Sequence, residues 1–217
     1  MNAEIDHLVI AARSLDDGVA WCEATLGIAP GAGGAHPLMG THNRLFALGA
    51  RAYAEIIAID PHAPPPERKR WFDLDHPDLL RSIARTPRLV HWVARAGDLD
   101  AALAALAALG IDAGRALAAS RESPRGTLRW RIAVRDDGVR PLRGALPALI
   151  EWGPLHPSDA LPASGVELRS LALGGDAALA DAVAALGLRG VEVRRDAPPL
   201  EARLATPRGE VRLTIAA

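Results

Sequence analysis

Apolar and polar positions follow the same order in two stretches of the chain. Residues 5–28, IDHLVIAARSLDDGVAWCEATLGI, pass from an apolar run through a polar turn into an amphipathic segment that ends at Leu-Gly. Residues 89–111, LVHWVARAGDLDAALAALAALGI, repeat that order. Ser14 and Asp98 are suitable N-caps, and the glycine that closes each stretch can take the left-handed conformation that ends a helix. Each stretch therefore predicts a strand, a helix and a C-cap.

Further apolar runs follow each of these helices. The first copy continues with a hairpin pattern at residues 43–48 and 53–59, which are separated by a glycine-containing turn. The second copy continues with strand patterns at residues 128–135 and 148–152. Each copy therefore predicts the order βαβββ. The second strand of each copy has the weakest pattern, near residues 28–34 and 112–119.

A third copy of the pattern occupies the end of the chain, where a strand pattern is followed by DAALADAVAALGL and further strand-like pieces. It lacks the histidine that the first strand of each earlier copy contains. A proline-rich connector separates the first two copies, and Pro77 suits the first turn of a short helix that ends near Arg85. A connector of this length usually covers a site or packs on a neighbour, although a surface loop anchored by Trp71 and Phe72 is an equal alternative. The pattern divides the chain into a first module (1–60), a connector (61–88), a second module (89–155) and a third, ligand-free βαββ-like module (164–217).

Composition indicates a globular protein. The chain has 217 residues, of which 49% are hydrophobic, and 25 basic against 26 acidic side chains give a net charge of −1. This balance argues against a nucleic acid or an anionic membrane surface as a partner. The N-terminus lacks a secretory signal pattern and no apolar run is long enough to cross a membrane, so we expect a cytoplasmic protein. Cys22 is the only cysteine, which excludes an internal disulfide and a thiolate metal cluster.

Each of the first two modules has one histidine and one glutamate in matching strands. His7 and His91 occupy equivalent places in the first strand, while Glu55 and Glu151 lie in the last. A carboxylate among apolar neighbours is costly to bury unless it is paired, hydrogen-bonded or bound to a cation. If the modules pair about a pseudo-twofold axis, the four side chains can converge on one divalent metal, for which Zn, Ni, Mn and Fe are suitable. The alternative is that both histidines are hydrogen-bonded residues of the core.

Further polar residues lie beside this expected site. His42 and Asn43 lie with His36 at a glycine-flanked strand entrance, from which they could reach a substrate, or instead bond the backbone of the turn. Tyr53 alternates onto the face of Glu55 and could offer its hydroxyl, although it could also serve only in packing. The remaining histidines are expected to be solvated: His62, His76 and His156.

The segments IDHLVIA with SLDDGVAWCEATLGI, GTHNRLFALGARAYAEIIAID, and LVHWVA with LIEWG resemble the vicinal oxygen chelate superfamily, and within it glyoxalase-like domain proteins. This resemblance implies an α+β fold in which paired βαβββ modules form an open, concave mixed sheet around one metal. Its four ligands would be His7, Glu55, His91 and Glu151. It also implies that the metal binds two neighbouring oxygens of a substrate, with Glu151 as the base.

Two functions follow as hypotheses. The first is a metal-dependent glyoxalase-like enzyme that acts on a small substrate with vicinal oxygens, by isomerase, lyase or dioxygenase chemistry through a metal-bound enolate. The second is a metal-free protein of the same fold that binds or sequesters a small ligand. The third module could form a half-site, cap the edge of the sheet, or build the interface of a homodimer.

Overall fold

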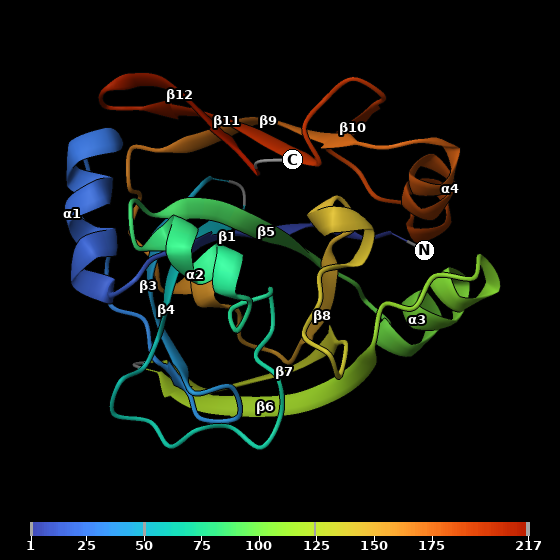
Figure 1. The fold of residues 1–217 in the computed structure, drawn as a ribbon, viewed down its shortest axis with the longest axis horizontal. Coiled ribbons are helices and arrows are strands. Elements are labelled where there is room, and N and C mark those ends of the chain that lie inside the picture. The colour runs from blue at the N-terminus through green and yellow to red at the C-terminus, as the bar shows by residue number, and fades with distance from the viewer. Residues whose placement is uncertain (1, 50, 124, 216–217) are drawn as a thin grey trace.

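The chain is described by a computed structural model over residues 2–49, 51–123 and 125–215. Its N-terminal part follows the order strand, helix and three strands (Figure 1). Both predicted N-caps of the first two modules bond the helices as expected, since the Ser14 side chain accepts from the Asp17 N–H and the Asp98 side chain from the Ala101 N–H. The elements of the first part are β1 (Glu4–Ala11), α1 (Leu15–Thr25), β2 (Ala35–His36), β3 (Thr41–Ala47) and β4 (Tyr53–Ile59).

The middle part repeats this order after the connector and its short helix. The second strand differs most from its prediction in both copies: β2 has two residues, whereas β6 has nine. The reason is that β2 pairs only with the start of β3, while β6 pairs with the whole of β7. The elements are α2 (Pro77–Ile83), β5 (Arg88–Arg95), α3 (Leu99–Ala108), β6 (Arg115–Ser123), β7 (Gly126–Val134) and β8 (Ala148–Trp152), with short 3₁₀ turns at Pro141–Gly144 and Pro157–Asp159.

One mixed sheet joins the two copies, in the order β2-β3-β4-β1-β5-β8-β7-β6. The two first strands, β1 and β5, pair antiparallel at its centre, and each pairs parallel with the last strand of its own copy. This arrangement confirms the predicted fold class of paired βαβββ modules in a curved mixed sheet. The boundaries that divide the chain into modules stay a prediction.

The C-terminal part forms a second, smaller sheet that packs on the first. It contains β9 (Glu167–Gly174), α4 (Ala177–Leu186), β10 (Val191–Arg194), β11 (Leu200–Thr206) and β12 (Gly209–Thr214), in the sheet order β10-β9-β11-β12. Figure 1 shows this sheet across the top of the molecule, with α1 and α4 at its two ends. One hydrophobic core contains side chains of both sheets and of α1, α3 and α4.

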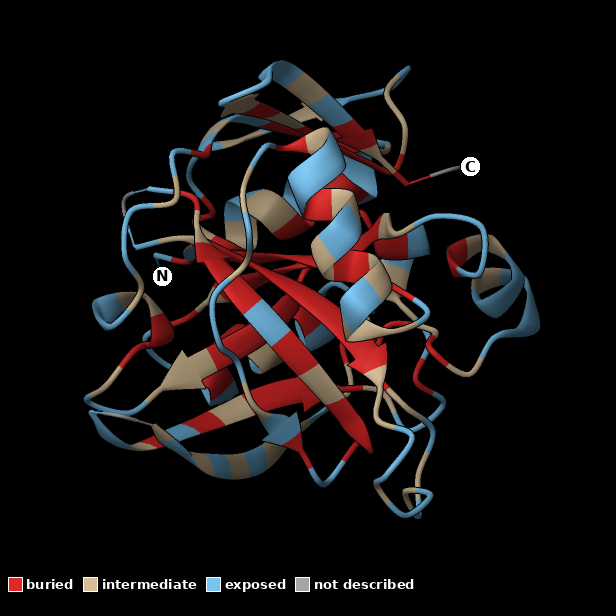
Figure 2. Cartoon of the chain, turned by 90° about the vertical axis from the view of Figure 1, so that its left-hand side faces the viewer, coloured by how far each residue is buried: buried red, intermediate tan, exposed pale blue. Residues whose placement is uncertain are grey.

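Strand alternation gives the large sheet two different faces. Leu8, Ile10 and Ile56 belong to the core shared with the helices and the smaller sheet, whereas Val9 and Ile57 face the concave side with part of the connector. Figure 2 shows exposed positions on the outer side of α1 and buried positions on the strands behind it. In the described part of the chain, no helix is long and apolar enough to cross a membrane.

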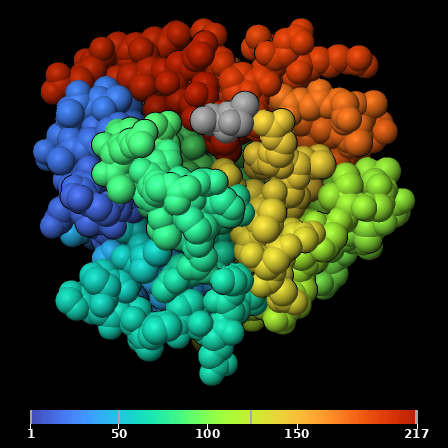
Figure 3. Space-filling view, viewed as in Figure 1, coloured from blue at the N-terminus to red at the C-terminus, as the bar shows by residue number. Residues whose placement is uncertain are grey.

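The connector lies across the concave face, as the first of the two sequence interpretations expected. Trp71 and Phe72 are buried in the concave cluster, and the Asp73 N–H donates to the Gly138 carbonyl oxygen at 3.0 Å. Asp73 also accepts from the Arg140 guanidinium at 2.6 Å. Figure 3 shows the connector and the segment that precedes β8 side by side on this face of the molecule. Together they close the concave side of the sheet.

Candidate functional site

A small, partly open space lies between the concave face of the sheet and the connector, and we call it the inner cavity. Its volume is about 30 Å³. Trp71, Phe72, Trp130 and Trp152 form most of its apolar wall. The polar side chains that line it are His7, His36, Asn43, Tyr53, Glu55 and Arg121.

His7 is held at this cavity by a buried carboxylate that the sequence reasoning missed. Asp6 is fully buried, and its Oδ1 lies 2.6 Å from Nδ1 of His7. The register of β1 against β5 shifts between Ile5 and His7, so Asp6 sits in a bulge. A bulge can re-aim a side chain out of strict alternation, which explains how neighbouring residues meet on one side of the sheet.

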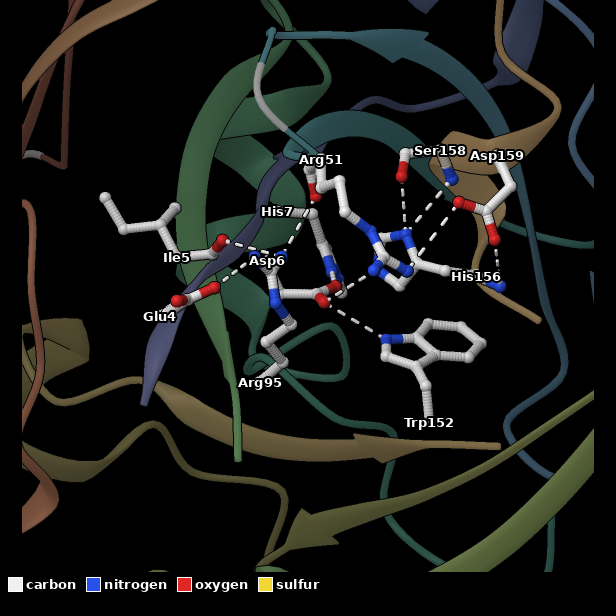
Figure 4. A network of polar contacts seen from close by, with 10 residues as sticks. All are labelled: Glu4, Ile5, Asp6, His7, Arg51, Arg95, Trp152, His156, Ser158 and Asp159. Atoms are coloured by element: carbon white, nitrogen blue, oxygen red, sulfur yellow. Dashed lines mark hydrogen bonds and ion pairs between the residues drawn. The ribbon is translucent and has the colours of Figure 1, made fainter. Parts of the chain in front are cut away.

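Asp6 accepts hydrogen bonds from three side chains, as Figure 4 shows in part. Its Oδ2 lies 2.9 Å from Nε2 of His156 and 3.1 Å from Nε1 of Trp152. Burial by itself raises the pKa of Asp6, but the hydrogen bonds from His156 and His7 outweigh it and lower that pKa to about 2. The carboxylate is therefore ionised at neutral pH, and His156 is a buried partner rather than the solvated side chain that its position after β8 suggested.

The ionised Asp6 fixes which nitrogen of His7 carries hydrogen. A carboxylate only accepts, so Nδ1 of His7 is the donor to it. In the neutral ring Nε2 then has a free lone pair, and it lies 3.8 Å from Oε1 of Glu55. Tyr53 stacks on the His7 ring with centroids 4.6 Å apart, which holds the plane of the imidazole.

Glu55 is buried and is oriented from its other side by Asn43. The Asn43 Nδ2 donates to Oε2 of Glu55 at 2.6 Å, while Oδ1 accepts from the Gly34 N–H at 2.9 Å. A side chain at Gly33 would collide with the Asn43 carbonyl oxygen, since an added Cβ would lie 2.1 Å from it. The absence of a side chain at Gly33 thus permits the close approach of this turn to Asn43.

His36 lines the same cavity in its neutral form. Burial, followed by the charge of Arg121, lowers the pKa of His36 to about 3. Its Nε2 lies 3.3 Å from Nδ2 of Asn43, and its ring packs edge-on against Trp71. The sequence pattern left the orientation of His36 open, and the structure turns it inward.

His42 points away from this group because it alternates with Asn43 along β3. Its Nε2 is buried and has no hydrogen-bond partner among the described residues. His42 does not line the inner cavity, whereas Asn43 does. The two side chains were expected to reach a substrate together, but they lie on opposite faces of β3.

Glu151 also lies on the other face of the sheet. Along β8, Ile150 and Trp152 line the inner cavity, so the residue between them faces α3. Its Oε2 accepts from the Leu99 N–H at 3.1 Å, at the start of α3, and lies 3.4 Å from Nη1 of Arg131. A carboxylate at a helix N-terminus is stabilised there by the unpaired N–H groups, which accounts for this glutamate without a metal.

His91 is buried on the concave side of the sheet, but its contacts are with Ala148 and Phe72 and not with the His7 and Glu55 pair. Its Nε2 accepts from the Ala148 N–H at 3.1 Å, and its ring lies against Phe72 with centroids 5.2 Å apart. Burial lowers the pKa of His91 well below the usual range, which keeps the ring neutral. His91 is thus bonded through Nε2, while its buried Nδ1 has no hydrogen-bond partner among the described residues.

The four expected metal ligands therefore do not converge. In the described part of the chain, no group of three or more His, Cys, Asp or Glu side chains is placed to hold a metal ion. His7 and Glu55 face each other, but Nε2 of His91 already accepts from the Ala148 N–H, and Glu151 lies across the sheet. The residues do not fit a four-ligand centre of this composition.

A solved structure with a similar fold supports the architecture described above. A hypothetical protein from Staphylococcus aureus aligns at 12% identity with a TM-score of 0.62 and covers 99% of this chain and 86% of its own. Methylmalonyl-CoA epimerase from Mycobacterium tuberculosis aligns at 20% identity with a TM-score of 0.41, over 72% of this chain and 91% of its own. No curated protein gave a match.

A family model described as a glyoxalase-like domain matches residues 5–189, from the first strand through α4. This match spans the inner cavity, the connector and both copies of the βαβββ order. Because it covers most of the chain, the protein belongs to the glyoxalase-like domain family of the vicinal oxygen chelate superfamily.

Proposed function

We propose that this protein is an enzyme that moves a proton on a carbon next to a carbonyl group, in a small substrate with vicinal oxygens. The observation that carries the proposal is the facing pair of His7 Nε2 and Glu55 Oε1, 3.8 Å apart in an aromatic-walled cavity. A positioned imidazole backed by a buried carboxylate is a suitable general base. The outcome would be an isomerase or lyase reaction.

His7 would take the proton from the substrate carbon at Nε2. The C–H electron pair then forms the carbon–carbon double bond of an enolate, and the charge moves to the carbonyl oxygen. Asp6 would stabilise the imidazolium through Nδ1, as a carboxylate does when it orients a catalytic histidine. Return of the proton to the neighbouring carbon, with transfer of the hydroxyl proton to the former carbonyl oxygen through Glu55, completes an isomerisation and restores the neutral ring.

Tyr53 and Glu55 would hold the two substrate oxygens. Burial raises the pKa of Tyr53 well above its usual range, so its hydroxyl keeps its proton and can donate to the enolate oxygen. Glu55 would accept from the neighbouring hydroxyl group. The 3.8 Å gap between His7 and Glu55 allows one substrate atom to lie about 2.8 Å from each, which is a normal hydrogen-bond length.

The resemblance to the superfamily implied a divalent metal, with Glu151 as the base. The four donors do not meet, so the proposed proton transfer uses side chains alone. Ring cleavage by dioxygen would depend on a metal centre of that kind. Measurement of the metal content of the purified protein distinguishes a metal-dependent reaction from proton transfer by side chains alone.

The second candidate is a binding protein without catalysis. It is favoured by the size of the inner cavity, which admits only a small group while Trp71 and Phe72 close it. In that case the polar residues would select a ligand rather than activate it.

The test is deuterium exchange from solvent into small 2-hydroxy ketones such as hydroxyacetone and 2-hydroxyacetophenone, followed by proton NMR. We expect the wild-type protein to catalyse exchange, and His7→Gln and Glu55→Gln to lose about 100-fold of the rate, the usual contribution of a general acid or base. Glu151→Gln separates the chemistries, because a metal centre that uses Glu151 would also lose activity, whereas the proton-transfer site would not.

Three results would contradict the proposal. Exchange that survives in His7→Gln at the wild-type rate would remove the assigned base. Exchange that is abolished by dialysis against a chelator and restored by Zn, Ni, Mn or Fe would instead support the metal-dependent reaction. Tight binding of the ketones with no exchange would favour the binding protein.

A further inference from the structure

A second space adjoins the inner cavity, and we call it the outer cavity. Its volume is about 200 Å³, and it lies between the β6–β7 hairpin, the turn before β2 and the segment after β8. Leu45, Leu128 and Leu155 contribute apolar surface to it. Arg121 lines both cavities, so its side chain stands at the boundary between them.

Arg121 differs from most half-buried arginines of this protein. Removing a guanidinium from water is costly unless a carboxylate compensates for it. Among the described residues, no carboxylate oxygen lies within 4.0 Å of the Arg121 guanidinium. Among those residues, Arg88 is the one other half-buried arginine without such a carboxylate, and it lines neither cavity. The half-buried arginines that do have such a partner are Arg68, Arg70, Arg95, Arg131, Arg135, Arg140 and Arg203.

The guanidinium lies beside the proposed reacting groups. Its Nη1 is 3.4 Å from Oδ1 of Asn43, the residue whose Nδ2 donates to Glu55. The two acidic residues that line the outer cavity are engaged elsewhere: Asp159 accepts from the His156 N–H, and Glu122 accepts from the Thr127 hydroxyl. Arg121 thus presents unused donors to a molecule that occupies both cavities.

We infer that the substrate carries a carboxylate, which pairs with Arg121, and that its apolar remainder lies in the outer cavity. This inference rests on the proposed function for the reacting end of the molecule, which would place a 2-hydroxy group against Glu55 or a 2-oxo group against the Tyr53 hydroxyl. The planar guanidinium fork matches two carboxylate oxygens. A phosphate fits less well, because its second charge would face Glu55 and Asp6 with one arginine to compensate.

The experiment compares an aromatic 2-oxo acid, phenylglyoxylate, with its uncharged methyl ester and with inorganic phosphate, by calorimetric titration of the full chain. We expect the acid to bind at least about tenfold more tightly than the ester and the phosphate, which is the contribution of one charge-assisted hydrogen bond. Arg121→Gln should remove this preference. Arg129→Gln, an exposed arginine in the same hairpin, should keep it.

A second variant tests the position of the guanidinium without removing its charge. A Cβ added at Gly34 would lie 2.3 Å from Nη1 of Arg121, so Gly34→Ala should displace that group and reduce the preference for the acid. Unchanged binding of the ester shows that either variant is folded.

The inference fails if phenylglyoxylate does not bind the wild-type protein, if the ester or phosphate binds as tightly, or if Arg121→Gln retains the preference. These outcomes are separate from those of the exchange experiment, because binding is measured without turnover. An acid preference that depends on Arg121, in a protein that exchanges no probe, would support the carboxylate site and contradict the proposed proton transfer.

Discussion

Asp6 shows how one buried side chain can define a site. It accepts from His7, His156 and Trp152, which come from β1, the segment after β8 and β8 itself. No local pattern marks it, because Asp6 is a single acidic residue beside a histidine at the start of a strand. Its partners are far away in sequence, and the bulge that turns it inward arises from the pairing of two strands.

Neutral buried histidines make the stability of this protein depend on pH. The folded pKa of His36 is about 3 and that of His91 is also far below 6.5, the value of an unperturbed ring. Their contribution is fully present above pH 6.5 and is lost as the pH falls below it, because the unfolded chain then binds protons that the folded chain does not. Each should reduce the free energy of unfolding by about 1.4 kcal/mol per pH unit.

The measurement is urea denaturation at successive pH values from neutral to mildly acidic. His91→Asn should flatten the pH dependence relative to the wild type, and His62→Gln, which changes an exposed ring, should not. A slope that is the same in the wild type and in His91→Asn would show that His91 is not held neutral in the folded state.

At the scale of elements, the connector decides access to the inner cavity. Arg70 pairs with Asp75 at 2.6 Å within it, and Asp73 is tied to the segment before β8. Phe72 and Asp73 both have φ of 59°, a conformation that non-glycine residues seldom adopt. The ion pairs and the burial of Trp71 and Phe72 compensate for the free-energy cost of this backbone conformation. Many weak contacts therefore hold the connector over the inner cavity.

Trp71→Ala tests the connector as a cover. Loss of this buried ring should reduce the free energy of unfolding by about 3 kcal/mol and should raise the association rate of a small ligand, because the ring packs against His36 at the cavity. Stopped-flow binding and urea denaturation give the two values. Trp21→Ala, in α1 and away from the cavity, is the matched control, and an unchanged association rate in Trp71→Ala would contradict the covering role.

At the scale of the whole molecule, the C-terminal sheet completes the core. The shared cluster includes Leu8 and Trp92 of the large sheet with Leu171 and Leu200 of the small one. Backbone hydrogen bonds also cross between the parts, from the Ala3 N–H to the Leu186 carbonyl oxygen at 3.1 Å and from the Leu168 N–H to the Leu48 carbonyl oxygen at 3.2 Å. The third unit thus covers the convex face of the sheet, and none of its described residues lines the inner cavity.

Removal of residues 164–217 should therefore prevent independent folding of the remainder. The full chain should unfold in one cooperative step, and the shortened chain should bind a hydrophobic dye and lack a thermal transition, because its convex face would be exposed. Differential scanning calorimetry provides the comparison. A shortened chain that unfolds cooperatively near the wild-type temperature would show that the two sheets have separate cores.

Local chemistry explains what could be predicted. The helices follow from their caps and apolar stripes, and Gly27 and Gly110 have φ of 77° and 74° after the helices that they end. The internal repeat and the resemblance to the superfamily predicted the paired-module fold, which is confirmed. Among the candidate residues, His7, Asn43, Tyr53 and Glu55 line one cavity, because strand alternation places them on the concave face.

The sequence by itself thus determined the repeated order of elements, the central strands and one half of the site, since these depend on periodicity and capping over a few residues. The tertiary structure alone decided the rest. Alternation along β8 turns Glu151 toward α3, and distant segments bring His156 to Asp6 and Arg121 to Asn43. Such contacts depend on strand register, bulges and loop paths, which are set by packing between segments far apart in the chain and leave no local signature.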